Sequence, residues 1–115
     1  MAVCQLAPAE DLPVWALIGG FSSVTRTADE WSVVCREGVV PPGTKCDTGW
    51  RIFQVAGPLD FSLTGILSSI AGPLAEAGVS IFALSTFDTD YVMVKAQDVD
   101  QAARVLEAAG HRVVP

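Results

Sequence analysis

The stretch that decides the fold is VSIFALSTFDTDYVMVK, residues 79–95. Two apolar runs, residues 79–86 and 90–96, flank a short polar segment, which predicts two strands joined as an antiparallel hairpin. A turn requires only a Gly or Asn with a polar neighbour, so the hydroxyl and carboxylate groups of this turn are candidates for binding a ligand. These candidates are Ser85, Thr86, Asp88 and Asp90.

A strand and a helix are predicted before this hairpin. Residues 50–57, WRIFQVAG, are rich in β-branched and aromatic residues and are followed by proline, which is typical of a strand and its end. In residues 58–79 apolar positions recur at helical spacing, and Gly78 supplies a left-handed stop. The apolar positions of this helix are Ile66, Leu67, Ile70 and Leu74.

A second helix and a final strand are predicted after the hairpin. Asp98 is the expected N-cap, Gln101 takes the capping-box position, and Gly110 ends the helix. Residues 112–114 predict one last short strand, which completes the order βαββαβ. Right-handed crossovers place both helices on one side of the sheet. The sequence therefore predicts an α+β fold, the ferredoxin-like sandwich, whose second sheet face carries no helix.

The first half of the chain is similar to the second. When the chain is shifted by 60 positions, residues 25–35 align with residues 85–95. In both segments hydroxyl residues precede an acidic turn and an aromatic strand start, which indicates an internal duplication. Pro and Gly in residues 37–49 predict a linker. We therefore expect a degenerate half in residues 1–49 and a complete domain in residues 50–115.

The composition excludes several classes of partner. Half of the residues are apolar and 17% are charged, which suits a compact fold with a further surface buried in an oligomer. The net charge is −6 and the seven Lys and Arg residues are scattered, which argues against nucleic-acid binding. No uncharged apolar run approaches the roughly 18 residues that a bilayer requires, and the first residues lack the pattern of a signal peptide. No membrane partner is expected.

The cysteines point to a reducing compartment. Cys4, Cys35 and Cys46 are odd in number and have no metal-ligand spacing, so neither a disulfide framework nor a zinc site is expected. The simplest interpretation is a cytoplasmic protein with reduced thiols.

Catalysis and metal binding are not expected. His111 is the single histidine, it follows a helix-ending glycine, and no nucleophile or carboxylate partner is evident in the sequence. No glycine-rich phosphate loop is present. Asp88 and Asp90 form an Asp-x-Asp pair, but a hard cation needs about six or more oxygens from a loop with a glycine turn. The sequence therefore predicts no enzyme, no metal site and no cofactor.

The start of the first predicted helix offers groups for a small ligand. A helix start has unsatisfied N–H donors and a partial positive charge, which accept a carboxylate, and Gly65 removes the side chain that would hold a ligand away. Asp60 or a hairpin aspartate suits an ammonium group. An α-amino acid carries both charges and is therefore the expected ligand. The residues at this helix start that could take part are Asp60, Ser62, Thr64, Gly65 and Ile66.

An alternative explains part of this loop without a ligand. Asp60, Ser62 or Thr64 could cap its own helix, as such residues do at many helix starts. This explanation accounts for one of these residues and leaves the others unexplained.

The chain resembles a known family. Residues 53–95 are similar to the ACT domain, in the subgroup found in aspartate-kinase-like regulatory regions, in the CASTOR arginine sensors and in small stand-alone bacterial ACT proteins. The similarity lies in GPLDFSLTGIL, PLAEAGVSIFALST and TDYVMVK, and with AARVLEAAGHRVV it covers about residues 50–114. The first half resembles the degenerate amino-terminal ACT-like unit of the same small proteins.

The resemblance implies a non-catalytic regulatory protein. Such domains bind a small ligand, usually an amino acid, at an interface between ACT units, and this binding regulates a partner enzyme. By position, the ligand loop is residues 60–66, and the facing strand end holds Ser85, Thr86, Asp88 and Asp90. A homodimer that buries the bare sheet edges or faces is expected.

The same sandwich also occurs in proteins with other functions. One alternative is a structural dimerisation or protein-interaction module whose ligand pocket is vestigial. An acylphosphatase-like hydrolase would need an Asn, and the sequence contains none. An RNA-binding sandwich would need exposed aromatic residues amid basic charge, which the acidic balance opposes.

Overall fold

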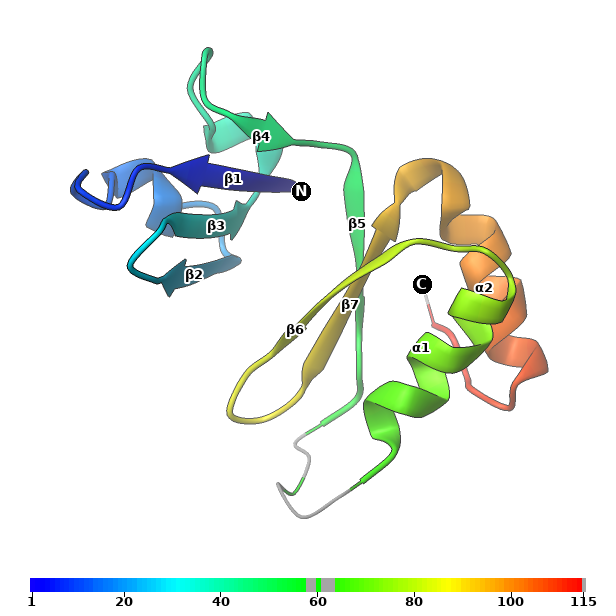
Figure 1. Cartoon of the computed structure of the whole chain (residues 1–115). Helices are drawn as coiled ribbons and strands as arrows, with labels where there is room; N and C mark the ends of the chain where they lie inside the picture. Colours follow the sequence, from blue (N-terminus) through cyan, green and yellow to red (C-terminus); the bar gives the residue numbers. More distant parts are fainter. Residues whose placement is uncertain (58–59, 61–63, 115) are drawn as a thin grey trace. The chain divides into compact units, whose positions relative to one another are not determined.

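The structure is a computed structural model that describes residues 1–57, 60 and 64–114. The chain divides into two compact units, Met1–Gly49 and Trp50–Pro115. Each unit has its own cluster of buried apolar side chains. The strands and α-helices of both units are labelled in Figure 1.

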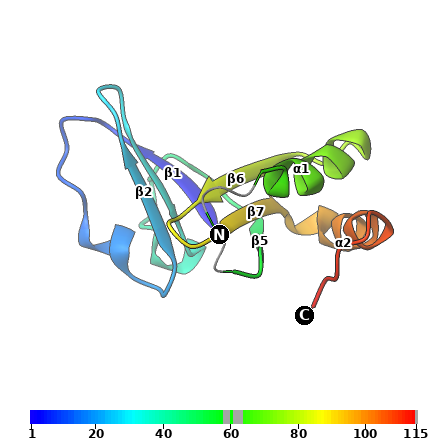
Figure 2. The same ribbon diagram turned by 90° about the horizontal axis from the view of Figure 1, so that it is seen from below.

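The second unit is a three-stranded antiparallel sheet with two helices on one side. Figures 1 and 2 show both helices against the same face of this sheet. Its strands stand in the order β5-β7-β6, which is the order of the first three strands of a ferredoxin-like sandwich. The α+β fold predicted from the sequence is confirmed. Its elements are β5 (Trp50–Gln54), α1 (Ile66–Glu76), β6 (Ile81–Ser85), β7 (Asp90–Lys95), the 3-10 turn η3 (Ala96–Asp98) and α2 (Val99–Ala108).

The core of the second unit lies between the sheet and its helices. Alternate residues of a strand face opposite sides, so Val92 and Val94 of the central strand both point towards the helices and are fully buried. Leu74 of α1 and Leu106 of α2 meet them from the other side. The helical spacing seen in the sequence thus places the apolar face of each helix on the sheet.

Two local predictions for the second unit are wrong. Residues 112–114 form no strand, although Val113 still packs against the core. Asp98 stands at the N-cap of α2 without a side-chain cap hydrogen bond, and the capping box is not formed. Instead, the Gln101 side-chain amide donates to the carbonyl of Ala77, 3.3 Å away, at the end of α1. The last carbonyls of a helix have no partner within it, so this bond between helices satisfies one of them.

The first unit is a four-stranded antiparallel sheet in the order β2-β3-β1-β4. Its core joins Ala2, Cys4, Val33 and Cys35 of the sheet to Ala16 of the short helical turn η1. Its elements are β1 (Ala2–Leu6), η1 (Val14–Leu17), β2 (Ser22–Arg26), β3 (Trp31–Cys35), the 3-10 turn η2 (Glu37–Val39) and β4 (Cys46–Asp47).

The predicted linker over residues 37–49 is wrong, because this segment belongs to the first unit. It contains η2 and β4, and β4 pairs with β1. Val39 and Val40 pack against the core of the unit. The Glu37 carboxylate also accepts a 2.5 Å hydrogen bond from the Gly49 N–H. Proline and glycine here shape turns and do not separate two folded parts.

Two features support a duplication. The first unit follows the same strand order as the second, with 3-10 turns in place of both helices. The turns before β3 and β7 also share one hydrogen-bond pattern: Thr27 N–H donates to the Glu30 carbonyl (2.9 Å), and Thr86 N–H donates to the Thr89 carbonyl (2.8 Å). In each turn the threonine hydroxyl accepts from the N–H three residues later. We propose that residues 1–49 are a degenerate copy of the second unit.

The buried thiol of Cys4 should make the stability of the first unit depend on alkaline pH. Burial, followed by the neighbouring Cys35 and Cys46, raises the pKa of Cys4 from 9.0 to about 12. Between these values the unfolded chain releases a proton that the folded chain retains. The free energy of unfolding should therefore fall as pH rises from 9.0 towards 12, by up to about 1.4 kcal/mol per pH unit.

Urea denaturation on either side of pH 9.0 checks this prediction. The matched variant is Cys4→Ala, which removes the titrating group and should show a smaller loss of stability at alkaline pH. Equal losses in both proteins would show that the Cys4 thiol does not contribute.

Candidate functional site

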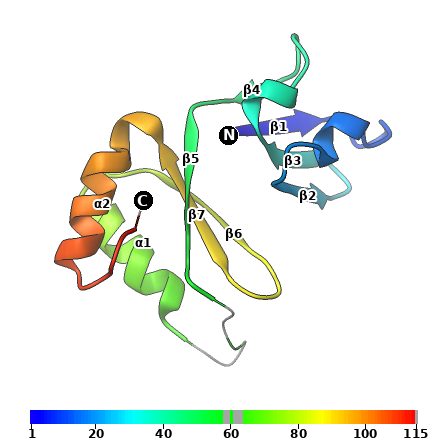
Figure 3. The same cartoon turned by 180° about the vertical axis from the view of Figure 1, so that it is seen from behind.

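The turn between β6 and β7 is tied to the chain as it leaves β5. The Thr89 hydroxyl donates to the Val55 carbonyl at 2.7 Å, and the Val55 N–H donates to the Asp90 carbonyl at 3.0 Å. A Cβ added at Gly57 would lie 3.0 Å from Thr89 Cβ and 3.1 Å from the Asp88 carbonyl oxygen. Figures 1 and 3 show the end of β5 and this turn at the same end of the sheet. The polar turn therefore borders the segment that leads into the predicted ligand loop.

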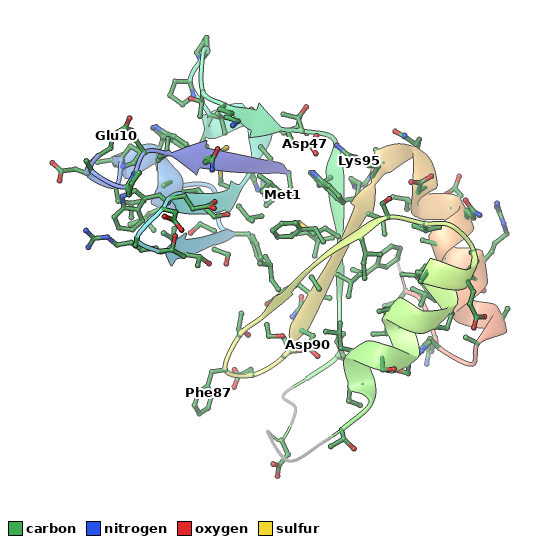
Figure 4. The ribbon with its side chains drawn as sticks, in the orientation of Figure 1. Met1, Glu10, Asp47, Phe87, Asp90 and Lys95 are labelled. Atoms are coloured by element: carbon green, nitrogen blue, oxygen red, sulfur yellow. The ribbon has the colours of Figure 1, made fainter. Side chains whose placement is uncertain are left out.

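Inside the turn, the candidate residues are held by hydrogen bonds to one another. The Ser85 hydroxyl donates to Asp90 Oδ1 at 2.7 Å, which fixes the carboxylate at the start of β7. Thr86 both donates to and accepts from the backbone of Thr89. Asp88 is exposed, and Phe87 is 79% exposed at the tip of the turn (Figure 4). The turn thus presents a fixed carboxylate, that of Asp90, and an exposed one, that of Asp88.

Helix α1 begins with glycine at its cap. Gly65 has φ 77° and ψ −1°, a left-handed conformation that favours glycine over residues with a Cβ. Its carbonyl accepts the first helical bond, from Ser69 N–H at 2.9 Å. The N-cap residue is Gly65 itself, which has no side chain with which to form a cap hydrogen bond. Capping of α1 by Asp60, Ser62 or Thr64 stays an alternative, and Ser62 lies outside the described residues.

The remaining predicted loop residues are placed in part. Asp60 and Thr64 are exposed, and Ile66 is half-buried in the first turn of α1. Phe61, Ser62 and Leu63 lie outside the described residues. The predicted site residues of the β6–β7 turn are therefore placed by hydrogen bonds. Of the predicted loop, the structure describes residue 60 and residues 64–66.

An apolar cavity of about 380 Å³ opens beside the first turn of α1. It lies between residues 53–56 at the end of β5, α1 and the C-terminal residues 111–114. Of the predicted site residues, Ile66 lines the cavity, whereas Ser85, Thr86, Asp88 and Asp90 are not among its lining residues. The cavity adjoins the helix start on the core side of the sheet.

Sequence reasoning missed the role of His111 in this cavity. Its ring Nε2 lies 3.0 Å from the Ser69 carbonyl. A carbonyl only accepts, so Nε2 carries the proton and donates. The signal for this contact is non-local, because it depends on the chain turning back along α1 after Gly110. His111 thus holds the C-terminal segment against α1, the helix that follows the predicted ligand loop.

The described ranges contain no arrangement of three or more His, Cys, Asp or Glu side chains suited to a metal ion. In those same ranges, every helix is too short or too polar to cross a bilayer.

Two family models match the chain. A model of the ACT domain matches residues 45–108, and a second model, described as an N-terminal domain, matches residues 1–43. The chain belongs to the ACT domain family. We call the second unit, Trp50–Pro115, the ACT unit. The resemblance identified from GPLDFSLTGIL and the following strands is thereby confirmed.

Known proteins similar to this chain include one solved structure along nearly its whole length. The X-ray structure of protein Atu0741 from Agrobacterium tumefaciens has a TM-score of 0.92 and 41% identity, over 98% of this chain and 84% of that one. A Vibrio cholerae protein, VC0802, has a TM-score of 0.76 at 17% identity, which shows a shared fold.

Curated relatives are similar over shorter stretches. The human "Cytosolic arginine sensor for mTORC1 subunit 1" is 39% identical over 59 residues, which make up 50% of this chain and 18% of the sensor. The human "Putative protein CASTOR3P" is 29% identical over 101 residues, or 76% of this chain and 62% of that protein. The chain thus spans about a fifth of the arginine sensor's length.

Proposed function

We propose that the ACT unit binds a free α-amino acid where the start of α1 adjoins the β6–β7 turn, and that binding regulates a separate partner protein. The observation that carries this proposal is the direct contact between the turn and the segment entering the ligand loop, through Thr89, Val55 and Gly57. Membership of the ACT family and similarity to a protein named as an arginine sensor support it. The relative's name also supports a cytoplasmic location.

The start of α1 and the β6–β7 turn together offer groups that suit a zwitterion. The N-cap of α1 is Gly65, which offers no side chain to the N–H groups of the first turn, and such groups bind a carboxylate. Asp90 is oriented by Ser85 and retains further acceptor capacity for an ammonium group, because a carboxylate accepts several hydrogen bonds. Asp88 and Asp60 add negative charge near the same end of the sheet, which favours a neutral or cationic side chain on the ligand.

The proposed role is non-catalytic, and the protein is proposed to act as a homodimer. The sheet register places Ile52 and Phe82, which are both half-buried, on the face opposite the helices. An apolar face without helices suits burial against a second copy. The same face also favours the alternative function, a dimerisation or protein-interaction module with a vestigial pocket.

Calorimetry and thermal shift with each standard amino acid separate these two functions. A ligand that binds only the folded state raises its stability, by about 2.7 kcal/mol when present at 100 times Kd. We expect one or a few amino acids to raise the melting temperature. Flat traces for all of them, from a protein that still dimerises, would favour the interaction module.

A pair of glycine variants tests the location of the site. Gly65→Ala and Gly43→Ala both place a methyl group on a left-handed backbone, with φ of 77° and 87° and no atom within 4 Å, so each should cost about 1 to 2 kcal/mol of stability. We expect only Gly65→Ala to weaken amino-acid binding, by about tenfold or more, since it crowds the helix start. Equal affinities of the two variants, measured by calorimetry, would place the ligand elsewhere.

A further inference from the structure

Three cysteines that are distant in sequence share one face of the sheet in the first unit. Cys4 of β1 lies opposite Cys46 of β4, and Cys35 of β3 lies opposite Ala2, two residues from Cys4. Residues directly opposite one another, and alternate residues of one strand, point to the same face. Both other thiols also act on the Cys4 thiol electrostatically and help to raise its pKa, as expected of neighbours on one face.

The strand register distinguishes the Cys4–Cys46 pair from the Cys4–Cys35 pair. The Gln5 N–H donates to the Lys45 carbonyl at 2.9 Å, which makes residues 5 and 45 a hydrogen-bonded pair. The next pair, Cys4 and Cys46, is therefore a non-hydrogen-bonded pair, in which Cα atoms are about 4.5 Å apart and side chains approach most closely. Disulfides require Cα atoms about 4.4 to 6.8 Å apart, while the diagonal neighbour Cys35 is expected at about 7 Å.

The exposure of the thiols sets the order of reaction. Cys46 is exposed on the edge strand β4, whereas Cys4 and Cys35 are buried. An oxidant in solution therefore meets Cys46 first. Burial raises the pKa of Cys4, so Cys4 holds less of the reactive thiolate and is not the first residue to react with the oxidant.

We propose that Cys46 and Cys4 form a reversible cross-strand disulfide on exposure to a peroxide. The Cys46 sulfur attacks one peroxide oxygen, the O–O bond breaks, and water leaves, so Cys46 becomes a sulfenic acid. The Cys4 sulfur then attacks the Cys46 sulfur. The S–S bond forms, the S–O bond breaks, and the hydroxyl leaves as water with the Cys4 proton. Two thiols and one hydrogen peroxide thus give one disulfide and two waters.

The Cys4–Cys46 disulfide would link the short edge strand β4 covalently to β1. β4 has two residues and pairs only with β1 in the described sheet. A disulfide between residues 4 and 46 closes nearly the whole first unit into one loop, and closing a long loop restricts the unfolded chain. Oxidation would therefore stabilise the first unit, and a thiol reductant would reverse the effect.

Peptide mapping of the full chain tests the proposal. Trypsin cleaves after Arg26, Arg36, Lys45 and Arg51, so the three cysteines fall in three different peptides, residues 1–26, 27–36 and 46–51. After treatment of the reduced protein with hydrogen peroxide and blocking of free thiols, we expect peptide 1–26 linked to 46–51 and lost on reduction. A link involving 27–36, a disulfide between two chains, or Cys46 oxidised to a sulfinic acid beside a free Cys4 would each overturn the proposal.

Two variants serve as matched controls. Cys46→Ser changes an exposed side chain and should abolish the linked peptide without disturbing the fold, as circular dichroism would confirm. Cys35→Ala removes the third thiol and should leave the link intact. A lost link in Cys35→Ala, with unchanged circular dichroism, would show that Cys35 takes part and would overturn the assignment.

Discussion

Replacing Leu74 by alanine should lower the free energy of unfolding of the ACT unit by about 2 to 5 kcal/mol. Leu74 is fully buried and belongs to the cluster that joins α1 to Val92 and Val94 of the central strand. The substitution removes buried apolar surface and leaves a cavity that the surrounding side chains fill only in part. Urea denaturation followed by circular dichroism measures the change.

Leu17→Ala is the matched control for this change. Leu17 is 64% exposed in the η1 turn, so the same substitution should alter stability by no more than about 0.5 kcal/mol. A loss of less than about 1 kcal/mol for Leu74→Ala would mean that α1 does not pack on the sheet as described.

Gly57→Ala should destabilise the ACT unit by about 1 to 3 kcal/mol and weaken amino-acid binding at the proposed site. The new methyl group would meet Thr89 Cβ at 3.0 Å and the Asp88 carbonyl oxygen at 3.1 Å. Both atoms belong to a turn held by its own hydrogen bonds, so the turn and the segment after β5 must separate. Separation would strain the Thr89 bond to Val55 and move Asp90 relative to the ligand loop.

Gly38→Ala is the control for the glycine change itself. A Cβ at Gly38 meets nothing within 4 Å, so this variant should keep both stability and binding. Thermal unfolding measures the first quantity and calorimetry with the identified amino acid the second. Equal behaviour of Gly57→Ala and Gly38→Ala would contradict the close contact between the turn and the loop.

Much of the ACT unit could be predicted because its signals are local. Alternating residues such as Val92 and Val94 mark a strand with a buried face, and Ile70 and Leu74 mark one side of a helix. Two strands joined by four residues have few ways to pair, so the β6–β7 hairpin followed directly. The position of both helices on one side of the sheet then followed from the handedness of the crossovers.

The errors arose where distant residues compete with a local pattern. Gln101 fits a capping box, yet the carbonyl of Ala77 on another helix takes its amide. Residues 112–114 have strand-like composition, but they line a cavity beside α1 and do not join the sheet. Strand β4 was missed because Pro and Gly residues surround it and because two residues are too few to show the alternation of a strand.

The candidate site was predictable in its residue types and less so in its contacts. The polar turn and Gly65 were both recognised, because turn chemistry and helix starts have local sequence signatures. The bond from Thr89 to Val55 spans 34 residues, and the bond from His111 to Ser69 spans 42. Such contacts depend on the folded sheet, and one sequence holds no local signal for them.

The pairing of β4 with β1 has a consequence for dividing the protein into fragments. β4 ends at Asp47 and β5 begins at Trp50, so the two units are joined without a spacer. A fragment that stops at Arg36 would lack β4, which pairs with one side of β1. The backbone N–H and C=O groups on that side of β1 could then pair with other molecules. The cut that respects both sheets falls between Gly49 and Trp50.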